Sequence, residues 1–91
     1  MPNYLVSYDL DKPGPKDYSR LENRLRSLGA TRLLYSQWLL KHPLPANGLE
    51  SDFMQYIDPS TDGFLIVQIV PGQTAWNRLM ISDDEVRQLL A

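Results

Sequence analysis

The order of its hydrophobic segments restricts the fold of this chain more than any other feature. Residues 4–8 and 64–70 have the composition of strands, residues 17–28 that of a helix, and residues 31–41 that of a hairpin turning near residue 35. A second helix is expected between the hairpin and the last strand. This order matches the split βαβ arrangement, which places four antiparallel strands side by side and both helices on one face. We predict the α+β class: one domain over residues 1–91, a ferredoxin-like βαββαβ sandwich with a short C-terminal helix.

The helix boundaries are predicted from capping residues. Asp17 is the expected N-cap of the first helix, and Gly29 stands where its C-terminal cap belongs. Asn47, with Glu50 three residues later, resembles a capping box for the second helix, whose apolar stripe consists of Leu49, Phe53, Tyr56 and Ile57. Ser82 with Glu85 predicts a stronger capping box for the last helix. Residues 73–81 fit either a short edge strand or a packed loop.

One face of the predicted sheet has no helix to cover it. The hairpin is apolar on both faces, and residues 64–70 form a near-continuous apolar run typical of a central strand buried on both sides. Two short helices can cover only one side of such a sheet. We therefore expect a homodimer in which a second copy covers the other side, with the alternative that the C-terminal tail folds across it.

Composition excludes several kinds of site. The chain has no cysteine, which rules out disulfides, thiolate zinc sites and cysteine nucleophiles, and its single histidine, His42, cannot form a histidine-rich metal site. His42 fits a surface loop residue better than a general base. No stretch approaches the length of a membrane span, and the chain starts without a signal-peptide pattern, so we expect a soluble cytoplasmic protein that does not contact membranes.

Positive charge is concentrated in the first half of the chain. Residues 1–41 contain seven basic and four acidic residues, a balance of +3, whereas residues 42–91 have a balance of −5. Arg20 and Arg24, one helical turn apart, either bind a phosphate backbone or are solvated, and Glu22 can pair with Arg26. Ser36 could bind a phosphate, although serine is also a routine turn residue.

Two carboxylates follow the first strand at alternate positions. Asp9 and Asp11 would point the same way if the strand geometry persisted, and Ser7 lies on the same face as Asp9. Carboxylates at a strand end suit a magnesium ion, which binds one or two anionic oxygens together with water and substrate phosphate. Aspartates beside proline and glycine also commonly serve only to turn the chain.

Short motifs in the first half of the chain resemble those of a known family. Tyr8-Asp9 closes the first strand, and Arg32, Tyr35, Ser36 and Trp38 lie in the hairpin. These residues, with the length and element order, resemble the small CRISPR-associated adaptation nuclease family, the partner of the integrase subunit in spacer acquisition. The resemblance covers about residues 3–70.

The resemblance implies a ferredoxin-like homodimer. It also implies that Asp9 lies near the dimer axis opposite its twin and takes part in magnesium binding and in cutting RNA or DNA. The partner would be an integrase subunit or, if the chain is closer to the related stand-alone toxin ribonucleases, an antitoxin.

The chain departs from the family pattern at three points. Leu34 and Gln37 replace a glutamine and a small aliphatic residue, the last strand of the family is replaced by the Trp76 segment and a capped helix, and the net charge is −2 where DNA-bridging members tend to be basic. These departures bear on a role in spacer integration more than on the fold.

The leading functional prediction is a dimeric magnesium-dependent endonuclease acting on RNA or DNA. Asp9 of each copy would be catalytic and hold the ion, and Asp11 would assist. The nucleic acid would be bound by Lys12, Arg20, Arg24, Arg32 and Ser36. The alternatives are a scaffold of the same fold that binds nucleic acid or protein without chemistry, and a small-ligand regulatory domain.

Overall fold

Four strands and three α-helices make up the computed structural model, which describes residues 1–9 and 15–91, with the backbone alone for residues 15–18. The strands are β1 (Asn3–Asp9), β2 (Thr31–Leu34), β3 (Gln37–Lys41) and β4 (Gly63–Gln68). The helices are α1 (Pro15–Ser27), α2 (Ala46–Phe53) and α3 (Asp83–Leu90), with short 3₁₀ turns η1 (Met54–Tyr56) and η2 (Pro71–Gln73).

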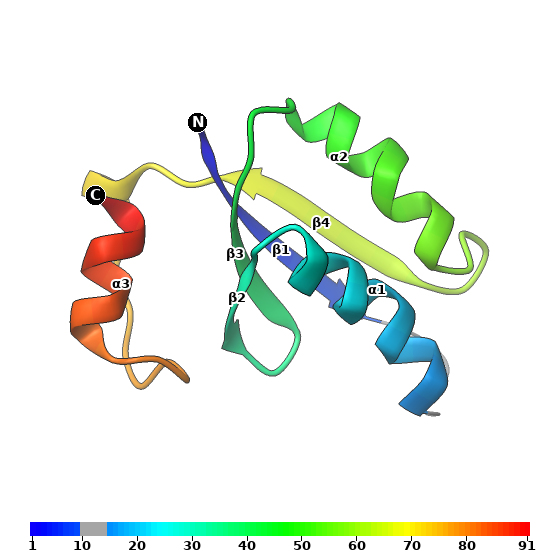
Figure 1. Ribbon diagram of the computed structural model, residues 1–91, viewed down its shortest axis with the longest axis horizontal. Coiled ribbons are helices and arrows are strands. Elements are labelled where there is room, and N and C mark those ends of the chain that lie inside the picture. Colours follow the sequence, from blue (N-terminus) through cyan, green and yellow to red (C-terminus); the bar gives the residue numbers. More distant parts are fainter. Residues whose placement is uncertain (10–14) are drawn as a thin grey trace.

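The strands form one antiparallel sheet in the order β2-β3-β1-β4. β1 is central and pairs with both β3 and β4, while β2 and β3 form the predicted hairpin around Tyr35 and Ser36. α1 and α2 lie on the same side of the sheet (Figure 1). The α+β class, the ferredoxin-like arrangement and the C-terminal helix predicted from the sequence are confirmed.

The main core lies between the sheet and its two covering helices. Alternate residues of β1, namely Tyr4, Val6 and Tyr8, point toward the helices and are buried, as are Trp38 and Leu40 of β3. The helices contribute Leu21, Leu25, Leu49 and Phe53 to the same cluster. This alternation fixes the orientation of β1, so Ser7 and Asp9 face away from the helices.

The C-terminal segment covers part of the sheet face that was expected to be bare. Leu39 points away from α1 and α2, yet it is only 5% exposed, and Val86 of α3 is 4% exposed. Leu5, Leu39 and Val67 of the sheet line one cavity together with Trp76, Val86 and Leu90 of this segment. The weaker alternative weighed from the sequence, a tail folded across the open face, thus holds for this end of the face. Leu65, at the other end, stays 59% exposed.

β4 is an edge strand, not the central strand that its apolar run predicted. Within the described part of the chain, its outer edge has no neighbouring strand. Its burial alternates, with Phe64 and Ile66 partly covered and Leu65 and Val67 exposed. The predicted central position was therefore wrong, whereas burial of the outer face by a second copy stays a prediction. A continuous apolar run is equally compatible with an edge strand whose outer face meets another surface.

Two of the helix ends follow the local rules predicted from the sequence. Gly29 adopts φ +80°, and the N–H groups of Gly29 and Ala30 bond to the carbonyls of Arg26 and Leu25, as in a Schellman motif. Ser82 caps α3 by accepting a hydrogen bond from the N–H of Glu85 at 3.2 Å, as predicted.

The other two predicted helix starts are wrong. α1 begins at Pro15, two residues before Asp17, consistent with the preference of proline for a first helical turn. Pro45 stands at the N-cap of α2 without a side-chain cap, so Asn47 lies inside the helix. Residues 74–81 form no strand but a packed loop, joined to the β2 edge by a bond from the N–H of Met80 to the carbonyl of Leu33. Among the described helices, none is long and apolar enough to cross a membrane.

Candidate functional site

Asp9 is the last residue of β1 and is exposed to solvent. It lies opposite Gly63 in the register with β4 and faces away from α1 and α2, on the side that carries Ser7 and Leu65. Asp11 and Lys12, predicted to assist in binding metal and nucleic acid, lie outside the described residues. Asp9 is thus the one predicted metal ligand that the described part of the chain places.

The donor set around Asp9 is small. Within residues 1–9 and 15–91, no group of three or more histidine, aspartate or glutamate side chains is arranged to hold a metal ion. Magnesium commonly needs only one or two carboxylates because water and substrate phosphate complete its shell. The described residues of one copy therefore offer one carboxylate of that shell, and a second copy would have to bring another.

Tyr8 points to the opposite side of the sheet from Asp9 and belongs to a buried polar network. Its hydroxyl donates to Glu22 Oε2 at 2.7 Å and accepts from Trp38 Nε1 at 3.1 Å. Burial raises the pKa of the Tyr8 hydroxyl, and the hydrogen bond to the Glu22 carboxylate raises this pKa further. Tyr8 and Trp38 are thus occupied in the core and are not available to stack on bases.

Arg32 is held by the same network. Its guanidinium forms an ion pair with Glu22 and lies 4.8 Å from the centroid of the Trp38 ring and 5.7 Å from that of Tyr35. Its Nε is buried and has no hydrogen-bond partner among the described residues. Its ion pair with Glu22 links the hairpin to α1. The Arg32 side chain is 24% exposed, so only this part of it is open to a contact with nucleic acid.

The sequence pairing of Glu22 with Arg26 was wrong. Glu22 pairs with Arg32, whereas Arg26 lies 5.4 Å from the centroid of the Trp38 ring and donates to Asn23 Oδ1 at 3.3 Å. The i,i+4 spacing identifies neighbours on one helix, but Glu22 instead accepts hydrogen bonds from Arg32 on β2 and from the Tyr8 hydroxyl on β1.

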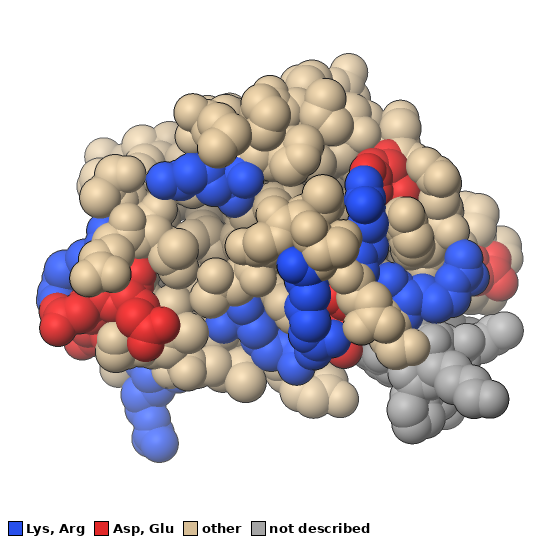
Figure 2. Space-filling view, in the orientation of Figure 1, with Lys and Arg blue, Asp and Glu red and all other residues tan. Residues whose placement is uncertain are grey.

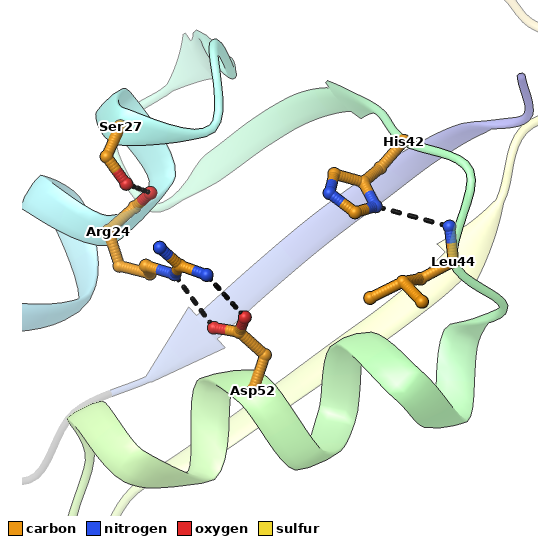
Figure 3. Close-up of polar contacts among 5 residues, drawn as sticks. All are labelled: Arg24, Ser27, His42, Leu44 and Asp52. Carbon is orange, nitrogen blue, oxygen red and sulfur yellow. Dashed lines mark hydrogen bonds and ion pairs between the residues drawn. The ribbon is translucent and has the colours of Figure 1, made fainter.

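Arg24 and Arg20 connect α1 to α2 and the turn after it. Arg24 forms a two-point contact with Asp52, with Nε to Oδ1 at 2.9 Å and Nη2 to Oδ2 at 2.6 Å (Figure 3). This contact lowers the pKa of Asp52 and raises that of Arg24. Arg20 is exposed and donates from Nη2 to the carbonyl of Gln55 at 2.8 Å. Of the two, Arg20 keeps more donors for an outside anion.

Ser36 lies in the β2–β3 turn at the same end of the sheet as Asp9. Its carbonyl accepts from the N–H of Tyr8 at 3.2 Å, and the neighbouring Tyr35 side chain is 75% exposed. His42 is a loop residue, as predicted, and its Nδ1 accepts from the N–H of Leu44 at 3.2 Å (Figure 3).

Acidic side chains form one dense group on the surface. The first turn of α3 holds Asp83, Asp84 and Glu85. In Figure 2 the largest acidic group lies at the end occupied by α3, while basic side chains and further acidic ones are spread over the rest of the view. The charge split between the two halves of the sequence is therefore only partly kept on the surface.

Solved structures provide the relevant comparisons, since no protein-family model matches the chain. A hypothetical protein, TT1823 from Thermus thermophilus, superposes with a TM-score of 0.67 over 88% of this chain and 95% of its own length, at 23% identity. Cas2 from Streptococcus pyogenes superposes with a TM-score of 0.57 over 75% of this chain and 86% of its own, at 22% identity. The chain shares the fold of both proteins.

Proposed function

We propose that this chain is a dimeric, magnesium-dependent endonuclease that cleaves RNA or DNA, similar in role to the CRISPR-associated protein Cas2. The observation that carries the proposal is the position of Asp9, an exposed carboxylate that ends the central strand on the sheet face away from the helices. The shared fold and the Tyr8-Asp9 motif support the same function.

Two copies complete the proposed site. Leu65 lies on the same face as Asp9 and is exposed, so a second copy that covers Leu65 also approaches Asp9. A two-fold axis there brings the two Asp9 carboxylates toward each other, because a closed dimer uses the same patch on both copies. Each copy then supplies one of the anionic oxygens that magnesium requires, with Asp11 assisting.

The remaining chemistry follows from charge. A bound magnesium ion would lower the pKa of an attacking water and offset the negative charge that develops on the phosphodiester. Arg20 is the described candidate best able to attract the nucleic acid, since Arg24 and Arg32 are already paired with carboxylates. Lys12 and Ser36 are the other proposed contacts. The protein partner would be an integrase subunit or an antitoxin.

A second function of a different class is a scaffold that binds nucleic acid and performs no chemistry. It is favoured by the basic side chains Arg20, Arg24 and Arg26 of α1. This function predicts binding that weakens with salt, survives loss of the Asp9 charge and fails when Arg20 and Arg24 are both replaced by alanine.

The deciding experiment measures cleavage and binding separately. Labelled RNA and DNA are incubated with the protein in magnesium, in excess chelator, and with the Asp9→Asn and Asp84→Asn variants. We expect chelator to abolish cleavage and Asp9→Asn to lower its rate by at least about 100-fold, the scale of a charged group lost from a reacting centre. Asp84, on α3 and 89% exposed at its side chain, serves as the matched control and should leave the rate unchanged.

Fluorescence anisotropy on the same oligonucleotides distinguishes the two functions. The nuclease proposal is contradicted if Asp9→Asn cleaves as fast as the natural chain. Binding without any cleavage, lost in the double arginine variant, would establish the scaffold instead.

A further inference from the structure

The sheet and the C-terminal segment of the same chain enclose a groove of about 600 Å³. Its floor includes Leu5, Leu39 and Val67, and its wall includes Trp76, Val86 and Leu90. Figure 1 shows the segment leaving the end of β4 and returning as α3 beside the β2–β3 hairpin. A volume of this size falls within the range of small-molecule sites in proteins, about 300–1,000 Å³.

Among residues 1–9 and 15–91, no charged residue lines the groove. The chain has 20 charged residues among 91, yet the lining consists entirely of aliphatic, aromatic, amide and hydroxyl side chains. The acidic first turn of α3 and the basic residues of α1 lie outside it. An ionic ligand would find no opposite charge there to offset its lost hydration, so the lining suits an uncharged one.

Most of the polar side chains that line the groove are amides. Gln37, Gln68, Gln73 and Asn77 line the groove, and none of these side chains makes a hydrogen bond to a described residue. Each amide side chain provides an NH₂ group with two donors and a carbonyl oxygen that accepts, and neither group is charged. A few such groups around an apolar floor are the usual means by which a small-molecule site orients its ligand.

The walls of the groove are already present in one chain. Val86 anchors α3, the Trp76 indole donates to Asp83 Oδ1 at 3.1 Å, and the N–H of Met80 holds the loop to β2. These contacts hold the wall of the groove in place within a single chain. The exposed end of the face, at Leu65, is separate from it.

We infer that the groove between the sheet and α3 binds an uncharged, mainly apolar small molecule that carries hydrogen-bonding groups. The inference does not depend on the proposed nuclease function, because Asp9, Ser36 and the arginines all lie outside the lining. It assigns the C-terminal segment a role in ligand binding.

A matched pair of fluorescent probes tests the chemical class. N-phenylnaphthylamine is uncharged, and anilinonaphthalene sulfonate has the same ring system with a sulfonate added. We expect the uncharged probe to brighten on binding with one site per chain, and the sulfonated probe to bind at least about tenfold more weakly, since its charge has no partner in the lining. Equal affinity for the two probes would overturn the inference.

Two tryptophan substitutions on one strand test the location. Val67→Trp places a large ring on the floor of the groove and should weaken the uncharged probe at least about tenfold. Leu65→Trp adds the same ring two residues away, on the same face but outside the lining, and should leave the affinity unchanged. An unchanged affinity in Val67→Trp would contradict the site.

Nuclear magnetic resonance on the natural chain keeps the test independent of the folding of any variant. On titration with the uncharged probe, the amide signals of Leu5, Leu39 and Val86 should shift, while those of Leu21 and Leu65 should not. The titration is repeated after tenfold dilution of the protein. An affinity that follows protein concentration, with one probe per two chains, would show an interface between copies and reject the groove.

Discussion

At the scale of single residues, Arg24 and Asp52 form the strongest polar link between α1 and α2. Two hydrogen bonds in parallel hold the guanidinium against the carboxylate, and the side chains are only 31% and 19% exposed. A two-point contact of this kind fixes the relative orientation of the two side chains in addition to the attraction between their opposite charges. The same contact removes Arg24 from the residues free to bind a phosphate.

Removal of this carboxylate should change how stability depends on pH. The pKa of Asp52 is lowered in the folded protein, first because of its hydrogen bonds to Arg24, so its contribution is complete above the unfolded pKa near 4 and is lost as pH falls through the folded value. We expect Asp52→Asn to lower the free energy of unfolding by about 1 kcal/mol at pH 7, and the difference to shrink toward pH 2. Urea titrations at several pH values measure it.

Glu50→Gln is the control for this measurement. Glu50 is an exposed residue of the same helix, and its side chain has no ion pair with a described residue. Its variant should match the natural chain at every pH. A constant difference for Asp52→Asn down to pH 2 would show that packing, rather than charge, makes the contact.

The residue identities predicted more of the fold than of the site. Strand alternation placed Ser7 and Asp9 on one face correctly, because a period of two leaves no other choice. The partners of Glu22, Arg24 and Arg32 were not predictable, because they lie 10 to 28 positions away and depend on how the helices cross the sheet. Asp11 and Lys12 remain predictions.

At the scale of elements, α3 depends on its first residues. Ser82 accepts from the N–H of Glu85 and its hydroxyl lies 3.2 Å from the Glu85 carboxylate, while Asp83, Asp84 and Glu85 give the first turn the charge that a helix N-terminus favours. The helix has only eight residues, and Val86 is its one buried residue. Such a short helix needs its cap to compete with unfolding.

Loss of the cap should therefore release α3 before the rest of the domain. We expect Ser82→Ala to destabilise the helix by about 1 kcal/mol, seen as faster amide hydrogen exchange in residues 83–90. Ser51→Ala is the control, because Ser51 is an exposed residue inside α2 whose hydroxyl bonds only to the carbonyl of Asn47. If exchange in α3 is unchanged in Ser82→Ala, packing around Val86 is sufficient to hold the helix.

Elements with a complete local signal were predictable and those with an incomplete one were not. Gly29 and Ser82 satisfy the ends of their helices within five residues of sequence, so the pattern alone identifies them. Asn47 has the spacing of a cap, but Pro45 already has the extended backbone of an N-cap and starts α2 earlier. The 3₁₀ turn η1 that follows α2 gave no signal of its own.

At the scale of the whole molecule, the second face of the sheet has one covered end and one open end. The C-terminal segment takes the end with Leu39, and the end with Leu65 and Asp9 remains open. Sequence periodicity revealed that this face was apolar but not what covers it, because the tail lies far along the chain from the strands β1 and β3 that it meets. The proposed dimer needs only the open end.

A charge at the centre of the open end should prevent the proposed dimer. We expect the natural chain to sediment as a dimer at micromolar concentrations and Leu65→Asp to raise its dissociation constant at least about tenfold, because the new carboxylate would be buried without a partner. Met54→Asp changes another exposed apolar residue, in η1, and should leave the dimer intact. A natural chain that stays monomeric at these concentrations would contradict both the dimer and the paired Asp9 site.

The outer edge of β4 has a consequence for how copies of the chain can associate. Its backbone groups on that side have no neighbouring strand among residues 1–9 and 15–91, and neither proline nor a basic side chain interrupts residues 63–68. If the β4 edges of two copies paired about a two-fold axis, each would satisfy the other, and the assembly would end as a closed dimer. If the β4 edge of one copy paired instead with the β2 edge of the next, the assembly would stay open and copies could be added without limit. Fibre growth in concentrated samples would therefore indicate the second geometry and its absence the first.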